Sequence, residues 1–163
     1  DGALHFSREL LKRMEIKGVQ TTEITLHMGM GHFRAVDVED LSKHKMDSEP
    51  MVISSESTQL INRAKNSGNR VFATGIDVLR AVETSVTTQR ELTTFEGWTN
   101  KFIFPPYDFC IPSALITNFH LPQSTMLMFA AAFGGYEKVM EAYKTAVKEK
   151  YRFGAYGDAM LLI

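Results

Sequence analysis

The sequence predicts an α/β fold in which a mostly parallel or mixed sheet is flanked by helices. Short apolar segments with strand character alternate along the chain with longer segments of helical periodicity. Polar corners follow several of these strands, as they do where α/β proteins bind ligands. The 163 residues suffice for one ordinary domain with its own core, so we expect residues 1–163 to form a single α/β domain.

Composition excludes several classes of protein. With 44% hydrophobic and 23% charged residues the chain is globular, and a net charge of -1 gives no basic character typical of nucleic-acid binding. The single cysteine, Cys110, excludes an internal disulfide framework and a cysteine-cluster zinc site. It fits a reducing compartment, so we expect a cytoplasmic protein. No apolar run approaches the ~18 residues of a membrane span, and no signal peptide is visible.

The first part of the chain, up to Gly68, predicts two helices and one or two strands. An amphipathic stripe from Leu4 to Met14 predicts a helix that ends at Gly18. Residues 19–28 are rich in Thr and Ile and predict a strand, followed by a turn at 29–33. A short strand at 51–53 precedes a helix that Ser54 or Ser55 caps and Gly68 ends.

The second half continues the alternation. We predict strands at 71–74, 101–104 and 114–117 and helices at 76–84, 126–133 and 136–150, with 85–97 as the most loop-like segment. Pro122 is expected in the first turn of the helix at 126–133, where its missing N–H costs nothing. Because the chain begins at Asp1 rather than Met and opens almost directly into a helical pattern, we expect it to be a piece of a longer protein.

The corner between residues 117 and 125 is the strongest candidate site. Asn118, His120 and Thr125 lie between a buried strand and the start of an apolar helix, where ligands gather in α/β proteins. A lone histidine is more often a structural hydrogen-bonding group than a catalyst, and for His120 the corner position makes the two interpretations about equal.

Other polar motifs carry weaker signals. The Gly29-Met30-Gly31 turn lacks the third glycine of a dinucleotide fingerprint, so it is either a tight turn or a close approach to a ligand. Asp77 is placed to interact with a helix dipole. Arg80 and Glu83 are three residues apart, which predicts a surface ion pair. Histidine spacing predicts no metal site.

Three segments of this chain carry a family resemblance. They are residues 117–125 (Thr-Asn-Phe-His-Leu-Pro-Gln-Ser-Thr), 151–160 with Tyr-Arg-Phe and Tyr-Gly-Asp-Ala-Met, and 25–34 with Thr-Leu-His, two glycines and Phe-Arg. The chain resembles the S-adenosylmethionine:tRNA ribosyltransferase-isomerase family of queuosine biosynthesis. This resemblance implies a two-domain protein, of which the chain is most of the α/β catalytic domain without the smaller β-rich domain.

The resemblance also implies a reaction. The family moves the ribosyl group of S-adenosylmethionine onto 7-aminomethyl-7-deazaguanine in tRNA and gives epoxyqueuosine, adenine and methionine. S-Adenosylmethionine is thus a donor substrate, tRNA is a partner of the full-length protein, and no metal or further cofactor is implied. The sequence makes no prediction of an oligomeric state.

Site residues follow from the same resemblance. The reaction needs an acid, a base and contacts to the donor. Candidate catalytic residues are His27, His120 and Asp158, and candidate substrate-binding residues are Gly29, Gly31, Arg34, Glu49, Gly75, Arg80, Asn118 and Thr125. We expect His27, the 29–31 turn, Gly75, Asn118 and His120 to line one concavity.

Some polar positions depart from the family pattern. They are His32, Asp47, Ile76, Asp77, Asn100 and Pro106. The departures keep two alternatives open: a diverged paralogue that binds S-adenosylmethionine or a nucleoside without this reaction, or a structural module. We expect the isolated chain to be inactive and to bind tRNA no better than roughly 10⁻⁴–10⁻⁶ M.

Overall fold

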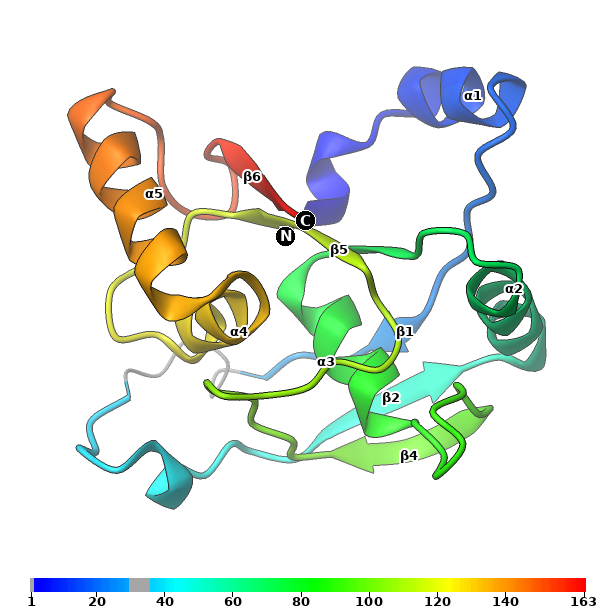
Figure 1. Ribbon diagram of the computed structural model, residues 1–163, viewed down its shortest axis with the longest axis horizontal. Helices are drawn as coiled ribbons and strands as arrows, with labels where there is room; N and C mark the ends of the chain where they lie inside the picture. The colour runs from blue at the N-terminus through cyan, green and yellow to red at the C-terminus, as the bar shows by residue number, and fades with distance from the viewer. Residues whose placement is uncertain (1, 30–35) are drawn as a thin grey trace.

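The structure, a computed structural model, describes residues 2–29 and 36–163 and contains two small sheets with helices around them (Figure 1). The first sheet has the order β1-β2-β4 and is antiparallel. The second has the order β3-β5-β6, with β3 and β5 parallel and β6 antiparallel to β5. The strands are β1 (Thr25–Leu26), β2 (Glu49–Ile53), β3 (Phe72–Thr74), β4 (Phe95–Thr99), β5 (Ala114–Asn118) and β6 (Ala159–Leu162).

Helix α3 lies between the two sheets, and α4 and α5 pack together beside the second sheet (Figure 1). Helix α1 stands apart from the body, and none of its residues is buried. The helices are η1 (Gly2–His5), α1 (Arg8–Ile16), η3 (Leu41–Lys43), α2 (Ser55–Asn66), α3 (Ile76–Thr84), α4 (Thr125–Gly134) and α5 (Tyr136–Lys148). The mixed α/β class predicted from the sequence is confirmed.

Serine caps fix where several of these helices begin, including α2 and α4. The Ser54 Oγ accepts the N–H of Ser57, and the Ser124 Oγ accepts the N–H of Leu127, each at 3.1 Å. Each bond satisfies a backbone N–H that has no partner within its helix. Pro122 precedes the Ser124 cap and therefore lies outside the first turn of α4, contrary to the prediction.

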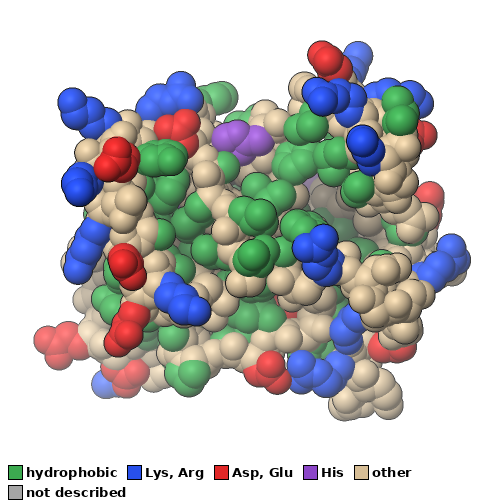
Figure 2. All heavy atoms as spheres, turned by 45° about the horizontal axis from the view of Figure 1, so that its top comes forward, with side chains coloured by type: hydrophobic (Ala, Val, Ile, Leu, Met, Phe, Trp, Pro, Cys, Tyr) green, Lys and Arg blue, Asp and Glu red, His purple; other side chains and the backbone are tan. Residues whose placement is uncertain are grey.

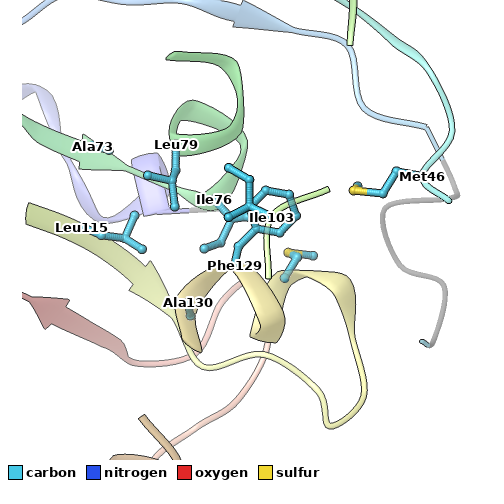
Figure 3. Close-up of a cluster of buried hydrophobic side chains, with 9 residues drawn as sticks. Met46, Ala73, Ile76, Leu79, Ile103, Leu115, Phe129 and Ala130 are labelled. Carbon is cyan, nitrogen blue, oxygen red and sulfur yellow. The ribbon is translucent and has the colours of Figure 1, made fainter. Parts of the chain in front are cut away.

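Two apolar clusters form the core, and α3 contributes to both. Ile76 and Leu79 pack into the first cluster with Leu115 and Phe129 (Figure 3). Residues further along α3 join the second cluster, whose buried members are Met51, Ile53, Ala81, Val82, Leu92 and Ile111. Because one helix buries apolar side chains against both sheets, α3 fixes the sheets relative to one another.

Several predicted strands differ from those in the structure. Only Thr25 and Leu26 of the expected 19–28 strand form a ladder, because they pair with Val52 and Met51 and their neighbours do not. Residues 101–104 form no strand, although Ile103 is fully buried. Strand β4 lies instead at Phe95–Thr99, partly within the segment predicted as a loop, where it pairs with β2.

Two further features of the sheets were not predicted. Strand β6 in the carboxyl-terminal tail pairs with β5. The strands also divide into two sheets of three rather than joining in one. Within the described residues, 2–29 and 36–163, no helix combines the length and the apolar character needed to cross a bilayer.

Candidate functional site

A buried amide organises the carboxyl end of β5. Asn118 has no exposed surface, and its Nδ2 donates to the carbonyl oxygens of Gly154, Ala155 and Gly157 at 3.1, 3.3 and 3.4 Å. Its Oδ1 lies 3.3 Å from Nε2 of His5 in η1. Since a buried polar group without partners destabilises the fold, these bonds hold three distant segments together.

The segment at residues 152–158, here called the 152–158 turn, is held by its own bonds as well. The Asp158 carboxylate accepts the Arg152 backbone N–H and an Arg152 guanidinium N–H, both at 2.8 Å. A side chain at Gly157 would collide with the Arg152 carbonyl, so only glycine fits there. The Arg152 hydrogen bonds hold the pKa of Asp158 below its usual range. Asp158 is therefore ionised at neutral pH.

A cavity of about 270 Å³ opens beside this turn. Its polar lining includes His5, Arg152, Asp158 and the ring of Tyr156, which is 88% exposed. The remaining lining residues are Leu4, Ala155, Gly157 and Ala159. The candidate Asp158 thus lies in a cavity, and the buried Asn118 supports the cavity wall.

His120 lies in the corner after β5 but is almost completely buried. Its Nε2 lies 2.7 Å from the Thr117 hydroxyl, and its backbone N–H donates to the Tyr143 hydroxyl of α5 at 2.7 Å. Burial raises the pKa of Tyr143 to about 12, so that hydroxyl stays protonated. Phe119 packs against Tyr143 with ring centroids 5.2 Å apart. These contacts fix the position of the corner.

Gly75 and Thr125 also lie near the carboxyl ends of the second sheet. Gly75 joins β3 to α3 with a φ of 98°, which favours glycine, and its N–H donates to the Ile116 carbonyl at 2.8 Å. A side chain on Gly2 of η1 would meet the Gly75 backbone, so η1 packs directly on this corner. Thr125 is fully buried as the first residue of α4.

A second polar group links the first sheet to α3. The fully buried Arg80 guanidinium pairs with the Glu49 carboxylate of β2 and donates to the carbonyls of Lys101, Asp47 and Thr99 at 3.0, 3.2 and 3.0 Å. The other Glu49 oxygen accepts the Gly29 N–H at 2.6 Å. In this structure Glu49 and Arg80 hold backbone segments in place.

The predicted surface ion pair between Arg80 and Glu83 is wrong. Glu83 is buried and accepts the N–H groups of Cys110 and Ile111 at 2.8 and 3.0 Å and the Tyr107 hydroxyl at 3.2 Å. Burial, with a further effect of the Glu83 charge, raises the pKa of Tyr107. Each charged side chain of this pair therefore bonds to different segments, and α3 anchors both.

His27 lies away from the polar corner around Asn118 and His120. It is exposed directly after β1, where its N–H donates to the Pro50 carbonyl at 2.9 Å. His27 does not line the cavity beside the 152–158 turn. Gly31, Arg34 and His32 lie outside the described residues, so the single concavity containing His27, Gly31 and His120 stays a prediction.

Three of the departing positions have structural roles. Ile76 is buried in the first core cluster, the Asp47 carbonyl accepts from Arg80, and the Asp77 carboxylate lies close to Gly75 at the start of α3. A hydrophobic residue at position 76 therefore serves packing rather than a polar site.

Sequence reasoning missed three residues of the cavity. They are His5, Arg152 and Tyr156. The 151–160 motif contained the signal for the last two, since it places an aromatic and a basic side chain beside Asp158. His5 gave none, because its link to Asn118 spans 113 positions. Among the described residues no cluster of three or more His, Cys, Asp or Glu side chains is arranged to hold a metal ion.

The chain matches known proteins over nearly its whole length. The family model described as queuosine biosynthesis protein matches residues 1–162. The S-adenosylmethionine:tRNA ribosyltransferase-isomerases of Parabacteroides distasonis and Bacteroides fragilis are both 60% identical, over 98% and 99% of this chain and 46% of each relative. The chain therefore spans about half the length of the curated relatives it matches.

A solved structure agrees with these relatives. The S-adenosylmethionine tRNA ribosyltransferase of Thermotoga maritima matches with a TM-score of 0.82 at 39% sequence identity. The match covers 99% of this chain and 51% of that one. The fold described above is thus shared with about half of that Thermotoga protein.

The buried Glu49–Arg80 pair predicts a large loss of stability on truncation. Arg80→Ala leaves a buried carboxylate and several carbonyls without a donor, so we expect the free energy of unfolding to fall by about 3–5 kcal/mol. Urea titration followed by circular dichroism measures it. Lys12→Ala removes an exposed pair with Glu15 and serves as the control, with an expected change below about 1 kcal/mol. An equal loss in both variants would refute the role of Arg80.

The Asp158–Arg152 contact predicts a shifted titration. At pH ~4 an ordinary aspartate is about half protonated, and Asp158 should be less protonated than that because the Arg152 contacts lower its folded pKa. The stability that the contact gives is present above the ordinary pKa and is lost as the pH falls through the lowered one. Carboxyl ¹³C shifts measure this titration. Arg152→Gln should raise the Asp158 midpoint, and an unmoved midpoint would contradict the assignment.

Proposed function

Because the chain belongs to the queuosine biosynthesis protein family, we propose that it forms the α/β part of an enzyme that modifies tRNA. The enzyme transfers the ribosyl group of S-adenosylmethionine to 7-aminomethyl-7-deazaguanine in tRNA and yields epoxyqueuosine. One observation carries the proposal: 60% identity, over 98% of the chain, to a protein named for this chemistry. Such identity far exceeds what a shared fold alone requires.

The proposed enzyme needs more than this chain. Since the chain spans 46% of its relatives, we infer that residues 1–163 form a single α/β domain and that the β-rich domain lies in the other part. S-Adenosylmethionine is the ribosyl donor and tRNA is the macromolecular partner, and the reaction requires no metal. A tRNA substrate and a single thiol favour the cytoplasm.

The reaction needs a base that removes a proton from the 5′ carbon next to the sulfonium. His27 suits this task because the residue is exposed and a neutral imidazole nitrogen can accept a proton. The ring of His120 is buried against Thr117, which supports a role in orienting the corner or in a proton transfer within a closed complex. Ionised Asp158 is a weak base, and its charge suits contact with a hydrogen-bond donor of the substrate.

We assign donor binding to two polar groups, the corner around Asn118 and the Arg80–Glu49 pair. The corner at Gly75, Asn118 and Thr125 is buried, with η1 packed on Gly75, so it offers a rigid floor beneath the donor. Gly29 is tied to Glu49 and, through it, to Arg80. We propose that Arg80 and Glu49 position Gly29 against the donor, and that Gly31 and Arg34 contact the donor directly.

A chimera tests the proposed function. The chain replaces the matching part of the Parabacteroides distasonis relative, and adenine release is measured with S-adenosylmethionine and tRNA carrying 7-aminomethyl-7-deazaguanine. We expect release by the chimera and none by the isolated chain. His27→Ala should slow release by about 10²–10⁴-fold, as loss of a general base does. His44→Ala, which alters neither the Asn118 corner nor the Arg80–Glu49 pair, is the control.

The outcomes separate the alternatives. A folded chimera that binds the donor without releasing adenine would refute the proposed reaction and favour the paralogue that only binds. A chimera that binds neither donor nor tRNA would favour the structural module. Adenine release by the isolated chain would show that the second domain is dispensable.

A further inference from the structure

We propose that the cavity beside the 152–158 turn binds one nucleotide of single-stranded RNA, with its base stacked on Tyr156 and a phosphate on Arg152. The inference rests on the proposed function, because it assigns part of the tRNA contact to this chain. It concerns residues that neither the reaction nor the family name specifies.

The first argument is the exposure of Tyr156. A tyrosine that is 88% exposed on the rim of a cavity presents a large apolar ring to water. Aromatic rings on a rigid support are the platforms on which unpaired bases stack. Such stacking tolerates any base, because every base has a π face.

The second argument is that the support is rigid. The Gly154 N–H donates to the Phe119 carbonyl at 2.9 Å, and the Asp158 N–H donates to the Arg152 carbonyl at 2.8 Å. The buried Asn118 amide binds the same turn from below. Tyr156 is therefore exposed on a segment whose backbone is held on both sides, which lowers the entropy lost when a ligand binds.

The third argument is charge. The Arg152 side chain is 75% exposed although its guanidinium is paired with Asp158, and His5 lines the same cavity. Lys and Arg side chains, interspersed with Asp and Glu, also lie over α5 and α1, the helices on the two sides of this face (Figure 2). From residue 7 to 18 the chain carries four basic and two acidic side chains. A locally basic surface attracts a phosphate backbone despite the net charge of the chain.

The spacing of these groups indicates the occupant. An RNA strand supplies a base and a phosphate one sugar apart, matching an aromatic ring and a cation four residues apart on one turn.

Titration with a short oligonucleotide tests the proposal. The probe is a single-stranded RNA pentamer with 2-aminopurine at its centre, whose fluorescence falls when the base stacks. The unaltered chain should quench it. Tyr156→Leu should weaken binding about tenfold or more, the usual effect of losing a stacking ring, whereas Tyr156→Phe should not. Tyr136→Leu removes another exposed tyrosine, which lies on α5, and is the matched control.

The phosphate contact has its own readout. Arg152→Gln should lower the slope of log K against log salt by about 0.7, as loss of one contact to a single strand does. Arg152→Lys should restore the slope because it restores the charge. The Tyr156→Leu variant should keep the slope of the unaltered chain, since a ring neutralises no phosphate.

Several results would overturn the proposal. They are no quenching by the unaltered chain at millimolar protein, equal binding by Tyr156→Leu, or an equal loss in Tyr136→Leu. Displacement of the pentamer by S-adenosylmethionine would assign the cavity to the donor instead. An active chimera whose Tyr156→Leu variant keeps its KM for tRNA refutes this inference alone. An inactive chimera with Tyr156-dependent quenching refutes the reaction alone.

Discussion

The buried amide of Asn118 determines how the carboxyl end of the second sheet is built. It bonds to the 152–158 turn and to His5, segments that lie 36–39 and 113 positions away in the chain. Each bond is modest in water, but removing the amide would leave the buried Gly157 carbonyl without this donor, at a cost of about 1–3 kcal/mol, and would also free the partly buried Gly154 and Ala155 carbonyls. One side chain thus places η1, the corner and the turn in a single arrangement, and the cavity exists only in that arrangement.

Helix α3 imposes the second constraint. Arg80 and Glu83 are both buried, and each satisfies backbone groups of segments that form no regular sheet there. Such groups need partners when they leave water, and a charged side chain can serve several of them at once. Through Arg80 and Glu49, the constraint extends to Gly29. The Arg80–Glu49 pair and the Glu83 carboxylate are therefore both anchored to the core through α3.

Local signals in the sequence predicted most helices correctly. The serine caps and glycine stops placed α2 and α4 within a few residues, and apolar spacing placed α3 at its observed bounds. Strands were harder, because β4 and β6 exist through pairing with β2 and β5 rather than through their own composition. Residues 101–104 show the reverse, since their apolar side chains fill a core without a strand partner.

The candidate site likewise has residues that local sequence predicts and residues that it does not. The Asn118 corner could be predicted because its polar residues are adjacent in sequence between two apolar elements. The roles of Arg80 and Glu83 could not, since a spacing of three residues on a helix predicts contact only when both side chains are exposed. Their partners, Glu49 and the 110–111 backbone, are fixed by packing that no local pattern records.

The central claim is that Asn118 organises the functional surface, and hydrogen exchange tests it most directly. The amides of Gly154, Gly157 and Asp158 are protected by bonds within the turn and to Phe119. In Asn118→Ala these amides should exchange about tenfold faster or more, while those of the β2–β4 ladder keep their rates. Asn100→Ala, which removes an exposed asparagine, should change neither set. Unchanged exchange of the turn in Asn118→Ala would contradict the account.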